Sequence, residues 1–264
     1  MNAGGRIVLI LGAGINGCSV ARELVLNGVG VWIVDTHDIA CGATSRSSRL
    51  IHGGLRYLEY GDFHLVRESL AERTTLRRLA PHLVEPLRLY IPVAQRSGGL
   101  LQSGTRFLGV ARSKVLGGLT RLLLGPTERG LWTIEIGLSL YDAFAADSAT
   151  PRHSVHEVAE PGLPRVDPKR YRWLCAYSDA QMRFPERYCV ALLDDARRIA
   201  RETNVEFRLL TYSQADFADG SLRISTAGGA VLTCGPSVVV NATGAWGDLT
   251  LNRLHVPAPR LFGG

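Results

Sequence analysis

The chain has 264 residues, of which 46% are hydrophobic and 20% are charged, and this composition excludes a disordered chain. It predicts a soluble protein with one large α/β domain or two smaller ones. The formal net charge of +6 suits anionic substrates or an anionic membrane surface, whereas nucleic acid is the poorer interpretation because no nucleic-acid-binding module accompanies the charge.

The first predicted unit runs from Ile7 to Asp35 and consists of a strand, a glycine turn, a helix and a second strand. Residues 7–11 form a continuous apolar run, which a buried parallel strand requires. Among the glycines that follow, Gly12 permits a tight turn, Gly14 lets the backbone approach a pyrophosphate, and Gly17 lets the helix lie close to the strand.

The helix is predicted to end at Asn27, and the strand from Val29 to Val34 leads into Asp35. A carboxylate at the end of this strand can accept hydrogen bonds from ribose hydroxyls. The unpaired N–H groups at the start of the helix would face phosphates, so the unit is predicted to bind the ADP part of a dinucleotide. The alternative is a tight turn without a ligand. The flanking strand, the stop at Gly28 and the terminal acid disfavour it.

The segment from Cys41 to Leu58 does not continue the strand and helix alternation. Hydroxyl-bearing and small residues alternate there with cations, which offers many donors to a phosphate-bearing ligand, and the pair Gly53 and Gly54 lets a flat ring approach the backbone. On composition alone, a solvated loop stays open as the less favoured interpretation.

A second helix is predicted to begin after Asp62, which is a good N-cap residue. The apolar residues Phe63, Val66 and Leu70 recur at helical spacing, and Pro81 ends the helix. Its arginines and glutamates are predicted to form a solvated face.

Residues 97–130 contain a helical pattern with an apolar face and an opposite face of cations. The apolar face consists of Leu108, Ala111, Val115, Leu119 and Leu122. The charges and glycines exclude a membrane span. An interfacial membrane helix stays open, but an ordinary helix packed on the protein is favoured.

Two more helices and a proline-rich connection follow in the sequence. Trp132 to Ala146 is predicted to be a buried helix, and Arg152 to Arg172 a connecting region. The next helix is predicted from Glu186 to Glu202, and its run Asp194 to Arg197 is interpreted as a solvated face.

The last part of the chain is rich in strand patterns. Three runs separated by turns are predicted to form a meander: Val205 to Leu210, Leu222 to Thr226 and Ala230 to Thr233. A buried strand from Val238 to Val240 then leads into the small residues Asn241 to Gly244, which would let the chain pass close to a dinucleotide.

The cysteines and the N-terminal residues indicate the cellular compartment of the protein. The five cysteines are scattered and include no CxxC pair, which argues against a disulfide framework and a zinc site and predicts reduced thiols. The first apolar run is a strand of the nucleotide fold rather than a signal peptide, so we expect a cytoplasmic protein.

Several motifs in this order carry a resemblance to a known family. They are GAGINGCSVARELVLNG, DIACGATSRSSRLIHGGLRYLEYGDFHLVRESLAER, APHLVEPLRLYIP, WTIEIGLSLYDAFA and VVVNATGAWGD. Together they resemble the FAD-dependent glycerol-3-phosphate dehydrogenases, which are quinone-linked flavoenzymes of the D-amino-acid-oxidase-like group. The block SSRLIHGGLRYLE is more specific than the glycine turn, and NATGAW supports FAD over NAD.

The resemblance implies site residues. The ADP part of FAD would be bound by Gly12, Gly14, Asn16, Gly17 and Asp35. The pyrophosphate and ribityl would lie along Thr44, Ser45, Ser47, Ser48 and Arg49, with Thr243 and Gly244 in the second FAD signature. The flavin ring would lie near His52, Gly53 and Gly54. Arg56 and Tyr57 would line the substrate pocket. His52 is the candidate proton acceptor, and the equally open alternative is that it orients the flavin ring.

The resemblance also implies an α/β fold, with a Rossmann-like FAD-binding domain and an interleaved α+β substrate-side domain. The FAD-binding domain would comprise residues 1–90 and 186–250, and the substrate-side region residues 91–185 with an insertion at 97–130. Residues 251–264 would begin a truncated substrate-domain segment. Because a resembling enzyme would continue beyond Gly264, we expect weak FAD binding and little activity from this chain alone.

The implied activity is oxidation of glycerol 3-phosphate to dihydroxyacetone phosphate, with electrons passed to a quinone and peripheral membrane contact. Arg49 stands where lysine is common in the family, and Phe184 to Arg187 replace an acidic run, which leaves the substrate open. Two alternatives therefore remain. One is a related flavoenzyme that acts on an amine or another hydroxy compound, and the other is an incomplete flavin-binding chain without turnover.

Overall fold

The computed structural model of the protein describes residues 7–97, 130–145, 150–218 and 221–260. The chain divides into two compact units, and each is described by itself. Unit 1 comprises residues 1–48 and 184–264, and unit 2 comprises residues 49–183. The family resemblance suggested a first domain boundary at residue 90. In the structure the first boundary between the two units follows Ser48, because the next segment pairs and packs within unit 2.

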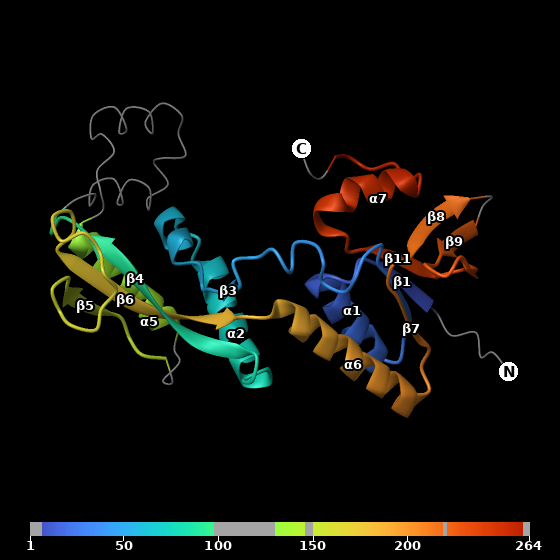
Figure 1. The fold of residues 1–264 in the computed structure, drawn as a ribbon, viewed down its shortest axis with the longest axis horizontal. Helices are drawn as coiled ribbons and strands as arrows, with labels where there is room; N and C mark the ends of the chain where they lie inside the picture. Colours follow the sequence, from blue (N-terminus) through green and yellow to red (C-terminus); the bar gives the residue numbers. More distant parts are fainter. Residues whose placement is uncertain (1–6, 98–129, 146–149, 219–220, 261–264) are drawn as a thin grey trace. The chain divides into compact units, whose positions relative to one another are not determined.

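Unit 1 is built on a parallel sheet with the strand order β11-β1-β2-β7 (Figure 1). Its strands are β1 (Ile7–Leu11), β2 (Gly30–Val34), β7 (Phe207–Leu210) and β11 (Val238–Asn241). Its helices are α1 (Ile15–Leu26), α6 (Pro185–Thr203), the short 3₁₀ helix η3 (Gly244–Trp246) and α7 (Gly247–Arg253). An antiparallel meander follows β7 and consists of β8 (Gln214–Ala218), β9 (Ser221–Ser225) and β10 (Val231–Cys234).

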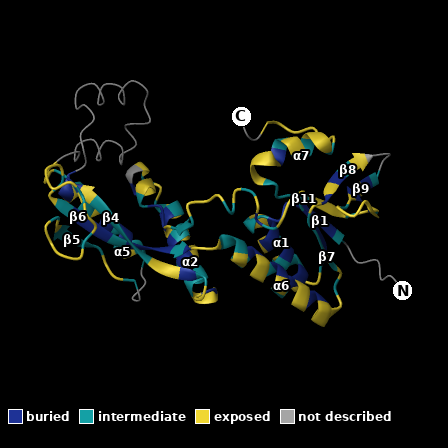
Figure 2. Cartoon of the chain, in the orientation of Figure 1, coloured by how far each residue is buried: buried dark blue, intermediate teal, exposed yellow. Residues whose placement is uncertain are grey.

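The apolar run of β1 is continuous because both faces of the strand are covered. Ile10 faces α1 and α6, which lie side by side, whereas Leu9 belongs to an apolar cluster that includes the meander residue Ile224. Both strand residues are fully buried. Figure 2 shows α6 with buried residues on one side and exposed residues on the other, as expected for a helix that covers a sheet.

The predicted meander is wrong in one strand. The strand that was expected to begin it is β7, which pairs in parallel with β2 and therefore belongs to the main sheet. The third strand of the meander is instead β8, with the sequence Gln-Ala-Asp-Phe-Ala, which the sequence analysis did not identify as a strand. Sequence pattern identifies a strand but not its partner, which explains the error.

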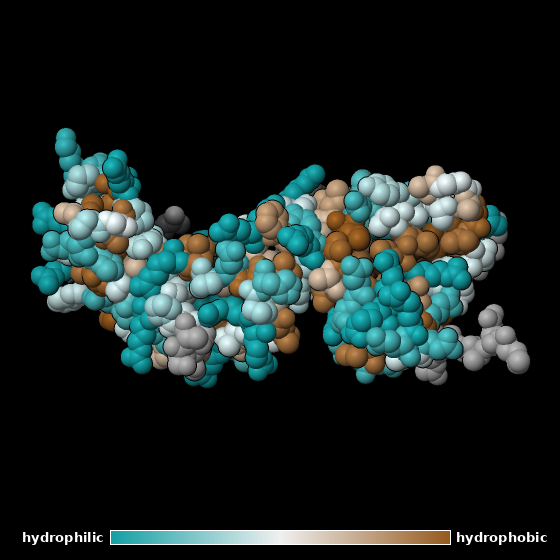
Figure 3. Space-filling view, turned by 60° about the horizontal axis from the view of Figure 1, so that its bottom comes forward, coloured by the Kyte–Doolittle hydropathy of each residue, from teal (hydrophilic) through white to brown (hydrophobic). Residues whose placement is uncertain are grey.

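The strand β11 was expected to be buried, but it lies at the edge of the described sheet and pairs only with β1 there. Val238 and Val239 are 52% and 39% exposed. Other large apolar side chains of unit 1 are also exposed, among them Trp246 and Leu249, and apolar surface is visible in Figure 3. Hydrophobic composition therefore did not report burial for this strand.

The charged run on α6 is only partly solvated. Arg197 and Asp194 lie on the surface, as expected, but Ala196 is buried. Asp195 accepts a 2.6 Å hydrogen bond from Arg22 of α1, so it ties the two helices together.

Unit 2 contains an antiparallel sheet with the order β3-β6-β4, and β5 also pairs with β6. The strands are β3 (Leu50–Ile51), β4 (Val84–Val93), β5 (Ser154–Glu157) and β6 (Trp173–Met182). The helices are the 3₁₀ helix η1 (Leu55–Tyr60), α2 (Phe63–Leu79) and α5 (Leu131–Ala145). The predicted N-cap of α2 is confirmed, because the Asp62 carboxylate accepts a hydrogen bond from the Leu65 N–H.

The sequence predicted that helix α5 is buried as a whole. In the structure it buries only one face. Leu138 and Tyr141 are buried against η1, α2 and β6, whereas Trp132 and Ile136 are 51% and 56% exposed. The end of the predicted helix at Ala146 lies outside the described residues.

The predicted amphipathic segment within residues 97–130 lies almost entirely outside the described residues. Among the helices that the structure describes, none is both long enough and apolar enough to cross a membrane.

Candidate functional site

The glycine turn after β1 has the close backbone contacts of a nucleotide-binding turn. Gly12 has a φ of +104°, and a Cβ added there would lie 2.6 Å from the carbonyl oxygen of Ala242. A Cβ at Gly17 would overlap the Gly12 carbonyl oxygen, so only glycine lets α1 approach the turn this closely. The tight turn and the close helix expected from the sequence are both present.

The N-terminus of α1 is open to an anion. Its N-cap residue Gly14 makes no side-chain cap, and the first turn of this helix contains no acidic residue. The Ile15 N–H donates to the Thr44 hydroxyl over 3.1 Å, which brings the loop after β2 to the start of the helix. Asn16 lies beside them and is exposed. Because unpaired helix N–H groups carry partial positive charge, this arrangement suits a phosphate.

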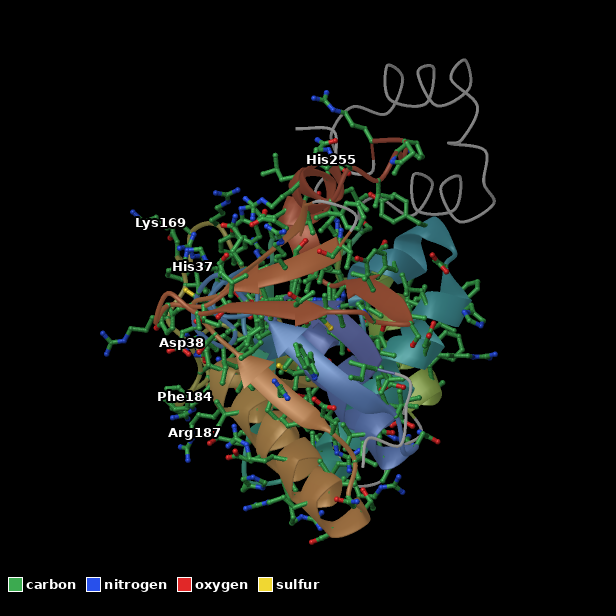
Figure 4. The ribbon with its side chains drawn as sticks, turned by 90° about the vertical axis from the view of Figure 1, so that its right-hand side faces the viewer. His37, Asp38, Lys169, Phe184, Arg187 and His255 are labelled. Atoms are coloured by element: carbon green, nitrogen blue, oxygen red, sulfur yellow. The ribbon has the colours of Figure 1, made fainter. Side chains whose placement is uncertain are left out.

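Asp35 supports the glycine turn from the end of β2. One carboxylate oxygen accepts a 2.7 Å hydrogen bond from the Ala13 N–H, and the other accepts a 2.9 Å hydrogen bond from the His37 N–H. Figure 4 shows His37 and Asp38 in the loop that follows this strand. The carboxylate is half-buried and keeps further acceptor positions, as a contact to ribose hydroxyls requires.

Replacing Asp35 with alanine should lower the free energy of unfolding by about 1 to 3 kcal/mol, because the Ala13 N–H would lose its acceptor. Urea-induced unfolding measures the change. The control is Asp194→Ala, which removes only an exposed ion pair on α6. Equal stability of the two variants would contradict a supporting role for Asp35.

The turn after β11 lies directly against the glycine turn. The Ala242 N–H donates to the Leu11 carbonyl over 2.8 Å, and the Thr243 Cα lies 3.1 Å from the position of a Cβ on Gly12. The Thr243 hydroxyl donates to the Asn241 side chain, so it is engaged within its own turn. Gly244 has a φ of +58° and open space around it.

The segment that begins at Cys41 is rich in hydroxyl-bearing residues and cations, but only some of its side chains lie at the glycine turn. The Ser45 hydroxyl donates to the carbonyls of Cys41 and Gly42, so it is used within its own loop. Ser47 and Ser48 are exposed. Arg49 has a φ of +61° and belongs to unit 2, where its guanidinium donates to the Arg183 carbonyl.

In unit 2 the residues expected near a flavin ring form a turn between β3 and η1. His52 is exposed, whereas Gly53 and Gly54 are buried. Gly54 has a φ of +70°, and its carbonyl accepts a 2.7 Å hydrogen bond from the Tyr57 N–H at the start of η1. Arg56 and Tyr57 are both exposed on this short helix. The structure therefore places the three turn residues and the two substrate-side residues in one local segment.

A buried charged cluster lies behind this turn, and the sequence did not predict it. Arg73 of α2 was expected on a solvated face but is 1% exposed. Its Nη1 donates to the Asp179 carboxylate of β6 over 2.8 Å, and the Tyr141 hydroxyl donates to the same oxygen over 2.6 Å. The Gly53 N–H donates to the Tyr141 hydroxyl over 2.8 Å. No local pattern could reveal these partners, because they come from distant elements.

The cluster holds its tyrosine in the protonated form. Burial, followed by the charge of Asp179, raises the pKa of the Tyr141 hydroxyl well above its usual range. The same two causes raise the pKa of the neighbouring Tyr177 to about 12. Tyr141 can therefore donate to Asp179 while it accepts from Gly53 at any physiological pH.

The start of α6 differs from what the family resemblance suggested. Phe184 is the N-cap residue and is 51% exposed, and Pro185 occupies the first turn of the helix. Figure 4 shows Phe184 and Arg187 close together at this end of the helix. These residues belong to unit 1 rather than to the substrate-side unit.

A family model described as FAD dependent oxidoreductase matches residues 8–263. This match fits the cradle in unit 1, where a glycine turn, an open helix N-terminus and a carboxylate converge. The residues present would hold the ADP part of FAD, and a Cβ on Gly12 would close the turn.

Curated relatives share sequence with most of the chain. A glycerol-3-phosphate dehydrogenase of Synechocystis is 30% identical over 94% of this chain and 40% of its own length. A D-erythritol 1-phosphate dehydrogenase of Brucella abortus is 35% identical over 73% of this chain and 30% of its own length. The chain thus spans less than half the length of these relatives.

A similar fold occurs in the crystal structure of the glycerol-3-phosphate dehydrogenase from Bacillus halodurans complexed with FAD. The TM-score is 0.53 at 17% identity, over 96% of this chain and 37% of that protein. At this identity the likeness shows the fold alone. It confirms the α/β fold class with a Rossmann-like sheet and additional antiparallel sheets.

Proposed function

Because the chain belongs to the family of FAD-dependent oxidoreductases, we propose that it oxidises glycerol 3-phosphate to dihydroxyacetone phosphate. The observation that carries this proposal is the 30% identity to a glycerol-3-phosphate dehydrogenase over 94% of the chain. The motif block around His52 to Leu58 supports the same activity, since it resembles that of the enzyme family.

FAD, when bound, supplies the acceptor for the hydride that leaves the C2 carbon of the substrate. In unit 1, the helix N-terminus at Gly14 binds the pyrophosphate, and Asp35 accepts hydrogen bonds from the ribose. Asn16, Thr44, Ser45, Thr243 and Gly244 are proposed to line the same ligand. Two observations support this: the Thr44 hydroxyl accepts from the Ile15 N–H, and Thr243 lies against Gly12.

In unit 2, the segment that follows β3 has four roles. The backbone at Gly53 and Gly54 provides a flat surface for a ring. Arg56 binds the substrate phosphate and Tyr57 lines the substrate pocket. His52 is exposed on the turn, and its ring nitrogen accepts the proton from the C2 hydroxyl.

Arg56→Lys should weaken glycerol 3-phosphate binding by about tenfold and leave FAD binding unchanged, because lysine keeps the charge but cannot fork onto two phosphate oxygens. The apparent substrate affinity is measured by flavin bleaching, with Arg78→Lys as a control at an exposed position. An unchanged substrate affinity would remove Arg56 from the phosphate site.

The proposed activity is tested by adding substrates to the yellow protein under anaerobic conditions. Glycerol 3-phosphate should bleach the flavin absorption, whereas glycerol without its phosphate should not. Lack of bleaching in a protein that carries a full complement of FAD would contradict the proposed substrate.

A second candidate is oxidation of a longer polyol phosphate. The relative that is 35% identical over 73% of the chain is a D-erythritol 1-phosphate dehydrogenase, and this observation favours the candidate. The same bleaching assay with D-erythritol 1-phosphate separates the two substrates. A response to an amine alone would instead support a related oxidase of this fold.

We also propose that the electrons pass to a quinone and that the protein contacts membranes peripherally. The net charge of +6 supports attraction to an anionic surface. Flotation with anionic vesicles should therefore exceed flotation with neutral vesicles and should decline with added salt. Reduction of a soluble quinone in the presence of substrate tests the acceptor.

A further inference from the structure

We infer that Arg73, Asp179 and Tyr141 form a positioning cluster that fixes the Gly53 turn from behind. The inference rests on the proposed function, because it takes this turn and the following η1 to carry the flavin-side and substrate-side groups. None of the three cluster residues is placed in contact with the substrate. They act through the backbone of the turn.

The hydrogen bonds form a continuous chain that ends on the turn. The Gly53 N–H donates to the Tyr141 hydroxyl over 2.8 Å and also to Asp179 Oδ1 over 3.3 Å. The Tyr141 hydroxyl in turn donates to Asp179 Oδ1 over 2.6 Å. Arg73 Nη1 donates to the same oxygen over 2.8 Å and to the Ser178 carbonyl over 3.0 Å. Since each bond polarises the next in a dry interior, the chain holds the Gly53 amide more firmly than a single neutral bond.

The burial of the cluster argues for a role beyond stability. The side chains of Arg73 and Asp179 are each 1% exposed. A buried ion pair contributes little more to stability than well-packed apolar side chains of similar volume. In the described part of the chain, Arg73 Nε and Nη2 also lack a hydrogen-bond partner. The pair therefore has a desolvation cost that a well-packed apolar pair would avoid. Its hydrogen bonds lead through Tyr141 to the Gly53 amide of the turn.

The turn has no freedom to shift without disturbing the cluster. A Cβ on Gly53 would overlap both the Leu70 side chain and the Tyr141 hydroxyl. Gly54 in turn accepts the 2.7 Å hydrogen bond from Tyr57 N that starts η1. A displacement of the Gly53 amide would thus move the segment that carries Arg56 and Tyr57.

Tyr141→Phe tests this inference, because it removes one hydroxyl and keeps the ring. The matched control is Tyr177→Phe, since the Tyr177 ring contacts the Tyr141 ring edge to face at 6.0 Å and, in the part of the chain that the structure describes, makes no hydrogen bond to the turn. We expect hydrogen exchange at the Gly53 amide to accelerate by on the order of tenfold in Tyr141→Phe and to stay unchanged in the control.

In the FAD-loaded protein, Tyr141→Phe should also shift the flavin midpoint potential and raise KM for glycerol 3-phosphate, whereas Tyr177→Phe should change neither. Faster Gly53 exchange with an unchanged potential and KM would reduce the cluster to a structural role and overturn the inference. Equal Gly53 exchange in the two variants would also overturn it.

Two further outcomes are distinguished: a Tyr141→Phe variant that does not fold, and a wild-type protein that does not respond to glycerol 3-phosphate. If Tyr141→Phe does not fold, the double variant Arg73→Met with Asp179→Asn replaces it, because it removes both buried charges and keeps an oxygen acceptor for Tyr141, and a smaller acceleration at Gly53 is expected. If the wild-type protein binds FAD but is not bleached by glycerol 3-phosphate, the proposed substrate fails. The exchange rates and midpoint potentials of the variants then still decide the positioning role.

Discussion

Gly14→Val is expected to purify without FAD, with its apparent affinity for FAD lowered by on the order of 100-fold, which corresponds to about 2.8 kcal/mol. Gly14 is the N-cap residue of α1, at the point where the backbone would approach the pyrophosphate. A Cβ at this position already lies 3.3 Å from the Thr44 hydroxyl oxygen. The larger valine side chain would therefore occupy the space proposed for the pyrophosphate. It would also push against Thr44 in the loop after β2.

The matched control is Gly235→Val, because a Cβ there meets no atom within 4 Å. This variant should bind FAD as the wild-type protein does. Flavin content is read from the visible absorption spectrum, and circular dichroism shows whether each variant is folded. A folded Gly14→Val protein with a full complement of flavin would contradict the assignment of the glycine turn.

Arg73→Met is expected to lower the free energy of unfolding by about 3 to 5 kcal/mol. The methionine fills similar space, but the buried Asp179 carboxylate loses its counter-ion and its 2.8 Å hydrogen bond. Removing one partner of a buried pair is costly because the other charge stays desolvated. Urea-induced unfolding measures the loss.

Two variants define the origin of this effect. Arg78→Met changes an exposed arginine on the same helix and should alter stability by less than about 0.5 kcal/mol. The double variant Arg73→Met with Asp179→Asn removes both charges and keeps an oxygen acceptor for Tyr141, so it should recover most of the stability. If Arg73→Met is as stable as Arg78→Met, the buried pair is not a structural element of unit 2.

The candidate site divides into a part that the sequence reveals and a part that it conceals. Gly12, Gly14, Gly17 and Asp35 are recognisable because their spacing along one unit already implies a turn, a helix start and a strand end. The buried cluster is concealed, because Arg73 and Asp179 are 106 residues apart and each looks like an ordinary charged residue in its own segment.

The segment after residue 40 shows how far a family resemblance extends. The resemblance implied that Thr44 lies along the FAD pyrophosphate, and in the structure its hydroxyl accepts from the Ile15 N–H at the start of α1. It gave no indication that the Ser45 hydroxyl would be used by its own loop or that Arg49 would donate to the Arg183 carbonyl. Side-chain direction depends on partners that a motif does not contain.

The sequence by itself determined the elements whose physics is local. The apolar run of β1, the glycine turn and the Asp62 cap of α2 follow from hydrophobic period, allowed backbone angles and capping, and each involves neighbouring residues only. The tertiary structure alone decided that β7 joins the parallel sheet, that β11 lies at its described edge and that Arg73 is buried. These features depend on which distant surfaces meet, because burial and pairing free energies belong to contacts between elements rather than to any one segment.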